Sequence, residues 1–223
     1  MQKGKLIVID GADNVGKATQ VKLLIERLVR EGKKADTLDF PRYEENVFGK
    51  LLKECLRGEH GDFMSLDPKI AATIFALDRF ESKEKLKELI GANDVVVLDR
   101  YTSANMLHQG AKIENVEKRR EFITWLEHIE FDIFGVPKPD LTIALAVNFE
   151  HSDLIFNTMV KEGQKDPDVA ELDRAHQREV AQCVEWMPSV DPSWRVLHCS
   201  GDDSLRTREE IHEDIYFLAS RIL

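Results

Sequence analysis

The sequence predicts an α/β fold in which a five-stranded parallel sheet is covered by helices on both faces. Five short apolar stretches alternate with longer segments whose apolar residues recur at helical spacing. The first and third stretches are continuously apolar, without the alternation of polar and apolar residues that marks a sheet with one wet face, so they resemble strands buried on both sides. Strands that alternate with helices in this way pair in parallel, because each connection crosses over the sheet.

The five strands are predicted from short runs between the helical segments, and the third of these runs is rich in β-branched residues. Pro41 stops the second strand, and the segment Pro137-Lys-Pro-Asp140 leads into the fourth. In chain order the predicted strands are residues 5–10, 35–40, 94–99, 141–147 and 194–199.

The helices are predicted from apolar spacing together with start and stop signals. Asp67 and Pro68 form an N-cap followed by proline at the first helical position, and Gly58 ends the helix before them. The predicted helices are residues 20–29, 47–57, 68 toward 89 with room for a break, 116–131, 150–160, 169–186 and 204–222. Polar loops are expected at residues 58–62 and 161–168.

Composition restricts the functional classes. The chain has 223 residues and a formal net charge of −10, which argues against general affinity for nucleic acid or anionic membranes. Cys55, Cys183 and Cys199 lie far apart and show no metal spacing, so we expect reduced, structural thiols. No signal peptide or spanning apolar run is evident, which suggests a reducing aqueous compartment such as the cytoplasm. Without repeats or linkers, residues 1–223 are expected to form a single domain.

A glycine-bounded loop between the first strand and the first helix is the strongest functional signal. Residues 11–19 read GADNVGKAT and match G-x-x-x-x-G-K-[ST], except that Ala18 replaces the final hydroxyl. Gly11 and Gly16 allow the backbone N–H groups to surround a polyphosphate, and Lys17 can reach its terminal phosphates. The alternative is a tight strand-to-helix turn with an incidental lysine.

Charged residues also follow the second and third strands, at the sheet edge where ligands of such folds bind. Asp99 is placed to orient Mg²⁺ through its water shell, and Arg100 to face a second phosphate. The alternative for these two is a strand-terminal ion pair. Arg42 follows a strand within a proline-bounded loop, where a plain surface arginine is the competing interpretation.

Phe75 and Arg79 stand four residues apart and therefore share one face of a predicted helix. An aromatic ring can stack on a nucleobase while an arginine donates hydrogen bonds to its edge. Taken alone, Phe75 is equally compatible with a core position. The seven histidines show no metal spacing.

Five segments in one order make the sequence similar to the thymidylate kinases of the P-loop nucleoside-monophosphate kinase family. They are residues 11–20, 40–43, 75–79, 99–110 and 137–142. The resemblance implies a P-loop NTPase-type fold, a homodimer, ATP as donor, dTMP as acceptor and Mg²⁺ as cofactor. The implied reaction is in-line phosphoryl transfer that yields dTDP. Two alternatives stay open: a kinase of another pyrimidine nucleotide, and a nucleotide-binding protein without transferase activity.

The resemblance also implies roles for single residues. Lys17, Arg100, Asp99 and Asp13 would be catalytic, and Asp99 would lie near the metal. The ATP phosphates would be held by Gly11, Ala12, Asp13, Asn14, Val15, Gly16, Lys17, Ala18 and Thr19. The acceptor nucleotide would be bound by Asp13, Arg42, Tyr43, Phe75, Arg79, Arg100, Asn105 and His108.

The sequence departs from the family pattern at three functional positions. Ala18 supplies no hydroxyl to the metal, and His108 stands where an aromatic residue is frequent near the sugar. Asn14 occupies a position where some members carry an arginine that reaches the transferred group. The positive charge would then come from a lid at residues 159–168, through Lys161 and Lys165, with Arg174 as a further candidate. A phosphate acceptor is largely dianionic at neutral pH and needs no general base.

Overall fold

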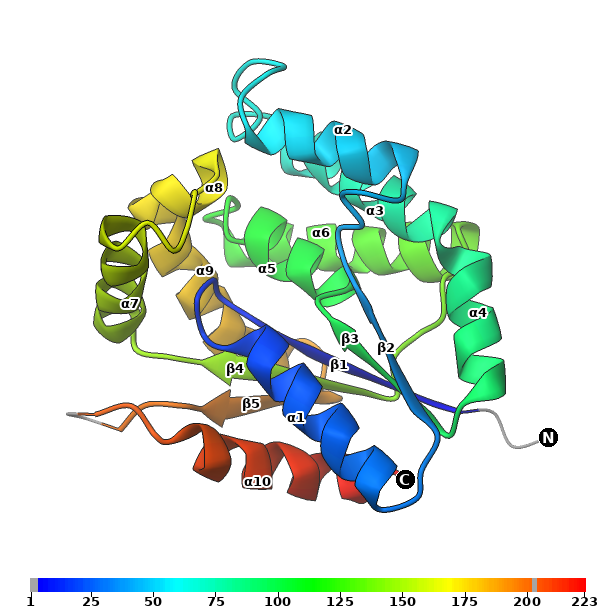
Figure 1. Cartoon of the computed structure of the whole chain (residues 1–223). Coiled ribbons are helices and arrows are strands. Elements are labelled where there is room, and N and C mark those ends of the chain that lie inside the picture. Colours follow the sequence, from blue (N-terminus) through cyan, green and yellow to red (C-terminus); the bar gives the residue numbers. More distant parts are fainter. Residues whose placement is uncertain (1–3, 202–203) are drawn as a thin grey trace.

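The computed structural model describes residues 4–201 and 204–223 and contains the predicted five-stranded parallel sheet (Figure 1). The strands lie in the order β2-β3-β1-β4-β5, and every pair is parallel. The first strand is therefore central, with β3 on one side and β4 on the other. The bounds are β1 (Lys5–Gly11), β2 (Ala35–Asp39), β3 (Val95–Asp99), β4 (Leu141–Ala146) and β5 (Trp194–His198).

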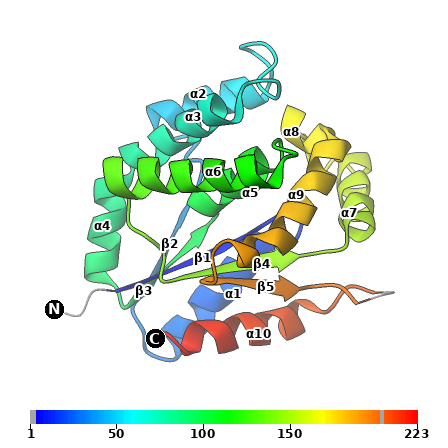
Figure 2. The same cartoon turned by 180° about the vertical axis from the view of Figure 1, so that it is seen from behind.

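Helices cover both faces of this sheet. The helices α1 and α10 lie against one face, whereas α5, α6 and α9 lie on the other side, as the view from behind shows (Figure 2). The α-helices of the described residues are α1 (Lys17–Arg30), α2 (Val47–Leu56), α3 (Pro68–Glu81), α4 (Lys83–Ala92), α5 (Thr102–Gly110), α6 (Val116–Glu127), α7 (Phe149–Lys161), α8 (Val169–Leu172), α9 (Arg174–Trp186) and α10 (Arg208–Ser220).

The central strand shows why its run of apolar residues forms a buried strand. Leu6 and Val8 pack in one cluster with Ile90 of α4, and Ile7 and Ile9 belong to another cluster with the helices. All four strand residues are at most 2% exposed. Because successive side chains point to opposite faces, both faces of β1 are apolar and both are covered.

Two predicted helix boundaries were wrong for reasons of capping. The last helix begins at Arg208 rather than at residue 204, because Thr207 and Glu210 form a capping box. Before it, Ser200 and Leu205 form an isolated bridge. The segment 169–186 is divided into two helices at Asp173, whose side chain accepts a hydrogen bond from the N–H of His176 and starts α9.

Two further elements differ from the prediction. The helix predicted over 116–131 is α-helical only to Glu127 and continues as a π-helix over His128–Ile133. Helix α5 was not predicted, although it lies directly after β3. The break foreseen in the third predicted helix is found at Ser82, between α3 and α4.

The glycines of the first loop have the conformations that the motif requires. Gly11 has φ +135°, and a Cβ there would lie 2.3 Å from the carbonyl oxygen of Leu145 on β4. Gly16 has φ +89° and immediately precedes α1. Both values lie in the region that favours glycine, so the loop can curl between strand and helix without strain.

The described residues bear on two expectations from composition. Cys55, Cys183 and Cys199 are buried and free, as predicted for structural thiols. Within residues 4–201 and 204–223, no helix combines the length and apolar character needed to cross a membrane.

Candidate active site

A cavity of about 400 Å³ opens where β1 and β3 end. Its walls come from the loop after β1, the ends of β2 and β3, helices α3 and α5, and the α8–α9 region. Most of the residues predicted to bind the acceptor line it, together with Asp99: Asp13, Tyr43, Phe75, Arg79, Arg100, Asn105 and His108. Residues far apart in sequence thus converge at the sheet edge that the topology predicts.

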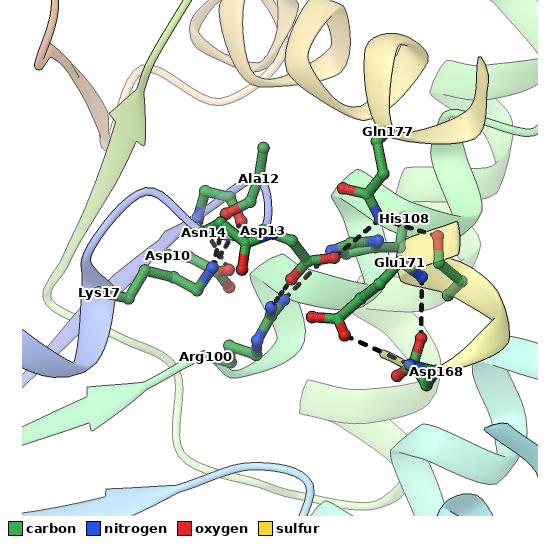
Figure 3. A network of polar contacts seen from close by, with 12 residues as sticks. Asp10, Ala12, Asp13, Asn14, Lys17, Arg100, His108, Asp168, Glu171 and Gln177 are labelled. Atoms are coloured by element: carbon green, nitrogen blue, oxygen red, sulfur yellow. Dashed lines mark hydrogen bonds and ion pairs between the residues drawn. The ribbon is translucent and has the colours of Figure 1, made fainter. Parts of the chain in front are cut away.

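Lys17 lies folded over the loop that it follows (Figure 3). Its Nζ donates hydrogen bonds to the carbonyl oxygens of Ala12 at 2.6 Å and Gly11 at 3.3 Å. Burial lowers its pKa to about 8, and Arg100 acts in the same direction, whereas Asp13 partly compensates. The ammonium group is therefore poised over the loop and close to other charges of the site.

Asp13 and Arg100 form an ion pair at the centre of the site. Asp13 also accepts a hydrogen bond from Nε2 of Gln177 on α9, at 2.8 Å. On its other side, Nη1 of Arg100 lies 3.1 Å from Nε2 of His108 on α5. Arg100 itself has φ 62°, an unusual conformation for a residue with a side chain. This network joins the glycine loop, the end of β3 and two helices.

The charges of this network fix its protonation states. Burial alone would raise the pKa of Asp13, but the charges of Arg100 and Lys17 and the hydrogen bond from Gln177 outweigh it, so the pKa lies well below its usual range. Burial lowers the pKa of His108 to about 3, and Arg100 contributes to this shift. A neutral His108 accepts a hydrogen bond from Arg100 on Nε2 and carries its own proton on Nδ1.

A second buried ion pair lies at the other end of the cavity. Arg79 of α3 donates to both carboxylate oxygens of Glu130, from Nε at 2.5 Å and from Nη2 at 2.6 Å. Asn105 of α5 donates to Glu130 Oε1 at 3.3 Å and to the carbonyl oxygen of Ala72 at 2.9 Å. Sequence reasoning missed Glu130; the only signal was a carboxylate placed between Ile129 and Phe131.

Aromatic side chains form part of the cavity wall. Phe75 is half-buried and packs edge-on against Phe63, with 6.0 Å between ring centroids. Tyr43 faces the same space, and burial raises the pKa of its hydroxyl, so the group is a neutral donor at neutral pH. The exposed part of Phe75 is compatible with the predicted stacking role.

Arg42 does not line the cavity. It is buried at 7% exposure, where its guanidinium lies 3.9 Å from Asp39 and 3.7 Å from Glu45. Its backbone N–H donates to Asp78 at 3.1 Å. Asp39 and Tyr43 both line the cavity, so Arg42 lies beside the cavity wall, and its role at the acceptor phosphate stays a prediction.

The predicted lid segment lies between α7 and α8. Lys165 contacts the glycine loop, because its Nζ donates to Oδ1 of Asn14 at 2.7 Å, and it also pairs with Glu171 at 2.5 Å. Lys161 is exposed at the end of α7. Arg174 is engaged elsewhere: its Nε donates to Asp153 at 2.6 Å, and its guanidinium lies over two aromatic rings.

Comparison with known proteins identifies the family. The family model for thymidylate kinase matches residues 9–196. The chain belongs to the thymidylate kinase family. A thymidylate kinase of Mycobacterium tuberculosis is 40% identical over 146 residues, which is 65% of this chain and 67% of that protein. The human thymidylate kinase is 27% identical over 218 residues, 98% of this chain and 91% of that protein.

A solved structure supports the fold. The thymidylate kinase of Candida albicans superposes with a TM-score of 0.74 at 24% sequence identity, over 98% of this chain and 92% of that one. The predictions of a P-loop-type parallel sheet and of a kinase of this family are thus confirmed. The roles of single residues, the lid and the metal remain predictions.

Proposed function

We propose that this chain transfers the γ-phosphoryl group of ATP to dTMP, forming dTDP and ADP. One observation carries the proposal beyond family membership. The glycine loop with Lys17 meets, through the Asp13–Arg100 pair, a cavity whose other end bears Phe75, Arg79 and Asn105. A donor-phosphate site and a site suited to a flat, hydrogen-bonding base are thus continuous.

In this proposal the residues act by position and charge. Backbone N–H groups of residues 11–19 and the N-terminus of α1 face the ATP phosphates, and Lys17 leaves the loop carbonyls to contact them. Arg100, held by Asp13 and His108, binds the acceptor phosphate. Both anions then lie in line, and the cations offset their repulsion, which is the main requirement of phosphoryl transfer.

The residues present fit a water-held magnesium ion. Asp99 lines the cavity at the end of β3, and among the described residues no side chain or backbone group donates a hydrogen bond to its carboxylate. Burial raises its pKa, although Lys17 and Arg100 oppose this. Asp10, in contrast, already accepts hydrogen bonds from Gly11 and Ser103. Because Ala18 offers no hydroxyl as a ligand, Asp99 would hold Mg²⁺ through water. The ion would neutralise charge on the phosphates.

The lid and the dimer complete the proposal. Residues 159–168 would close over ATP, with Lys165 moving from Asn14 to the transferred group; Lys161 would add charge from the rim. Residues 1–223 would act as a single domain.

We also propose a homodimer, because Ile70 of α3 and Val116 of α6 are 56% and 45% exposed and lie on neighbouring helices. Light scattering after gel filtration measures its mass.

The alternatives receive less support. The set Lys17, Asp99 and Arg100 is intact, which disfavours a protein that only binds nucleotides. The alternative of a kinase for another pyrimidine nucleotide is tested by comparing the rates of ADP release with different acceptors. We expect Mg²⁺-dependent release of ADP with dTMP to exceed that with dUMP, dCMP, UMP, CMP, AMP or GMP. Binding of ATP without turnover on any of these acceptors would contradict the proposal.

A further inference from the structure

The buried carboxylate Glu130 has no role in the proposed transfer, yet it contacts two residues of the acceptor cavity. Its side chain is 0% exposed, and Arg79 and Asn105 are each 3% exposed. It comes from the π-helix after α6, whereas its partners come from α3 and α5. A buried carboxylate needs paired donors, and here all the donors come from cavity residues.

Glu130 determines which donors of Arg79 remain available. Two of the three guanidinium nitrogens, Nε and Nη2, are directed at the carboxylate. The third, Nη1, has no partner among the described residues and is not a buried orphan, while Arg79 lines the cavity. Arg79 therefore presents Nη1 to a ligand, and an arginine can only donate.

Glu130 also fixes the orientation of the Asn105 amide. Both N–H bonds of Nδ2 are used, by Ala72 O and by Glu130 Oε1. A flipped amide would bring its oxygen against these two oxygens, with no proton between them. The free group of Asn105 is therefore Oδ1, which can only accept, and Asn105 lines the cavity as well.

We propose that Glu130 is a positioning residue that sets base specificity, by making the cavity offer one donor from Arg79 and one acceptor from Asn105. The complementary base edge has a carbonyl oxygen next to an N–H group, as thymine and uracil have. Cytosine has the opposite pattern, an amino group beside an unprotonated ring nitrogen, and would meet donor with donor and acceptor with acceptor. The inference rests on the proposed function, because it concerns the base of that acceptor.

The sharpest test compares dUMP with dCMP, which have the same sugar and phosphate and differ only in this edge. For the unaltered enzyme we expect kcat/KM to favour dUMP by roughly 10²-fold or more, since a mismatched edge leaves buried polar groups unpaired. In Glu130→Gln, one carboxylate oxygen becomes a donor, so the amide of Asn105 can flip and Arg79 loses one acceptor. We expect the dUMP/dCMP ratio to fall by about tenfold or more.

Two further variants separate positioning from stability. Glu130→Asp keeps the charge but cannot reach both partners, so its ratio should lie between those of the unaltered enzyme and Glu130→Gln. Glu127→Gln removes a carboxylate about one turn earlier whose single ion-pair partner among residues 4–201 and 204–223 is Lys138, at 3.6 Å. Its dUMP/dCMP ratio should not change. A purely structural Glu130 would lower activity toward both nucleotides equally.

The outcomes are distinguishable from those of the proposed function. Unchanged dUMP/dCMP ratios in folded Glu130→Gln and Glu130→Asp would overturn the inference; if only Glu130→Asp folds, its ratio decides. If the unaltered enzyme turns over no acceptor, the proposed function fails. The edge preference is then measured by calorimetric binding of dUMP and dCMP to the same proteins, with the same expected order.

Discussion

The Asp13–Arg100 pair offers the most informative perturbation, because it is a buried ion pair and we propose that it also takes part in the transfer. The side chains of the pair are 8% and 23% exposed. Two unit charges about 4 Å apart attract by about 4 kcal/mol at an effective dielectric constant of 20. Removing one member of a buried pair costs about 3–5 kcal/mol, whereas exposed pairs contribute about 0–1 kcal/mol. For Arg100→Met we therefore expect a loss of about 2–4 kcal/mol in unfolding free energy.

The pH dependence of this loss has a definite sign. In the unaltered protein the pKa of Asp13 is depressed, so its contribution is present above the unfolded pKa of about 3.9 and is lost as pH falls below it. Without Arg100, burial raises the pKa of Asp13 relative to the unaltered protein. The destabilisation should then be largest at neutral pH and should shrink as the carboxylate is protonated. Urea unfolding at pH 7 and pH 4 measures both values.

A double variant separates the two roles of the pair. Asp13→Asn combined with Arg100→Met removes both charges, while the amide can keep the hydrogen bond from Gln177. We expect stability to recover in part relative to Arg100→Met alone, but kcat/KM for dTMP to stay about 10²–10³-fold below that of the unaltered enzyme. Full turnover by Arg100→Met, or a double variant less stable than the single one, would refute this reasoning.

Three further predictions follow from single contacts. Lys17→Met should keep the fold and lower kcat by about 10²–10³-fold in an ADP-release assay, because we propose that the ammonium over the loop carbonyls contacts the ATP phosphates. Gly49→Ala should lower the melting temperature, because its Cβ would lie 2.0 Å from the carbonyl oxygen of Arg42. Gly91→Ala on α4, where nothing lies within 4 Å of the added Cβ, should instead stabilise the protein by about 0.5–1 kcal/mol. Burial raises the pKa of Asp168 to about 6, so its ionisation destabilises the folded state as pH rises from about 4 through 6. Asp168→Asn should therefore raise the free energy of unfolding, measured in urea, by roughly 1–2 kcal/mol at pH 7 and by much less at pH 4.

The sequence predicts the glycine loop well because its constraints are local. Gly11 and Gly16 need backbone conformations that other residues adopt rarely, and both lie within one short motif. The strands β1 and β3 were equally accessible, because their residues are almost all apolar and are buried on both faces of the sheet. Helix α5 was not predicted, because seven of its nine residues are buried, including Ser103, Asn105 and Gln109. A helix surrounded on all sides shows no apolar stripe to detect.

The remaining differences depend on contacts between distant residues. Glu130 looks like part of a solvated helix face until Arg79, 51 positions earlier, is known to lie against it. The contacts of Arg42 are instead local: Asp39 and Glu45 each stand three residues away and lie beside its guanidinium. Such partners are visible in the sequence, and the role of Arg42 at the acceptor phosphate stays a prediction.

The site shows how a chain with net charge −10 can hold cations where anionic substrates are proposed to bind. Arg79 and Arg100 are both largely buried, and each is paired with a carboxylate, Glu130 and Asp13. An unpaired buried cation would cost several kcal/mol, so these carboxylates stabilise the folded site. They also fix the direction of each guanidinium before a substrate arrives. In the proposed function, the nitrogens that remain free, and not the total charge, then determine which phosphate and which base edge can bind.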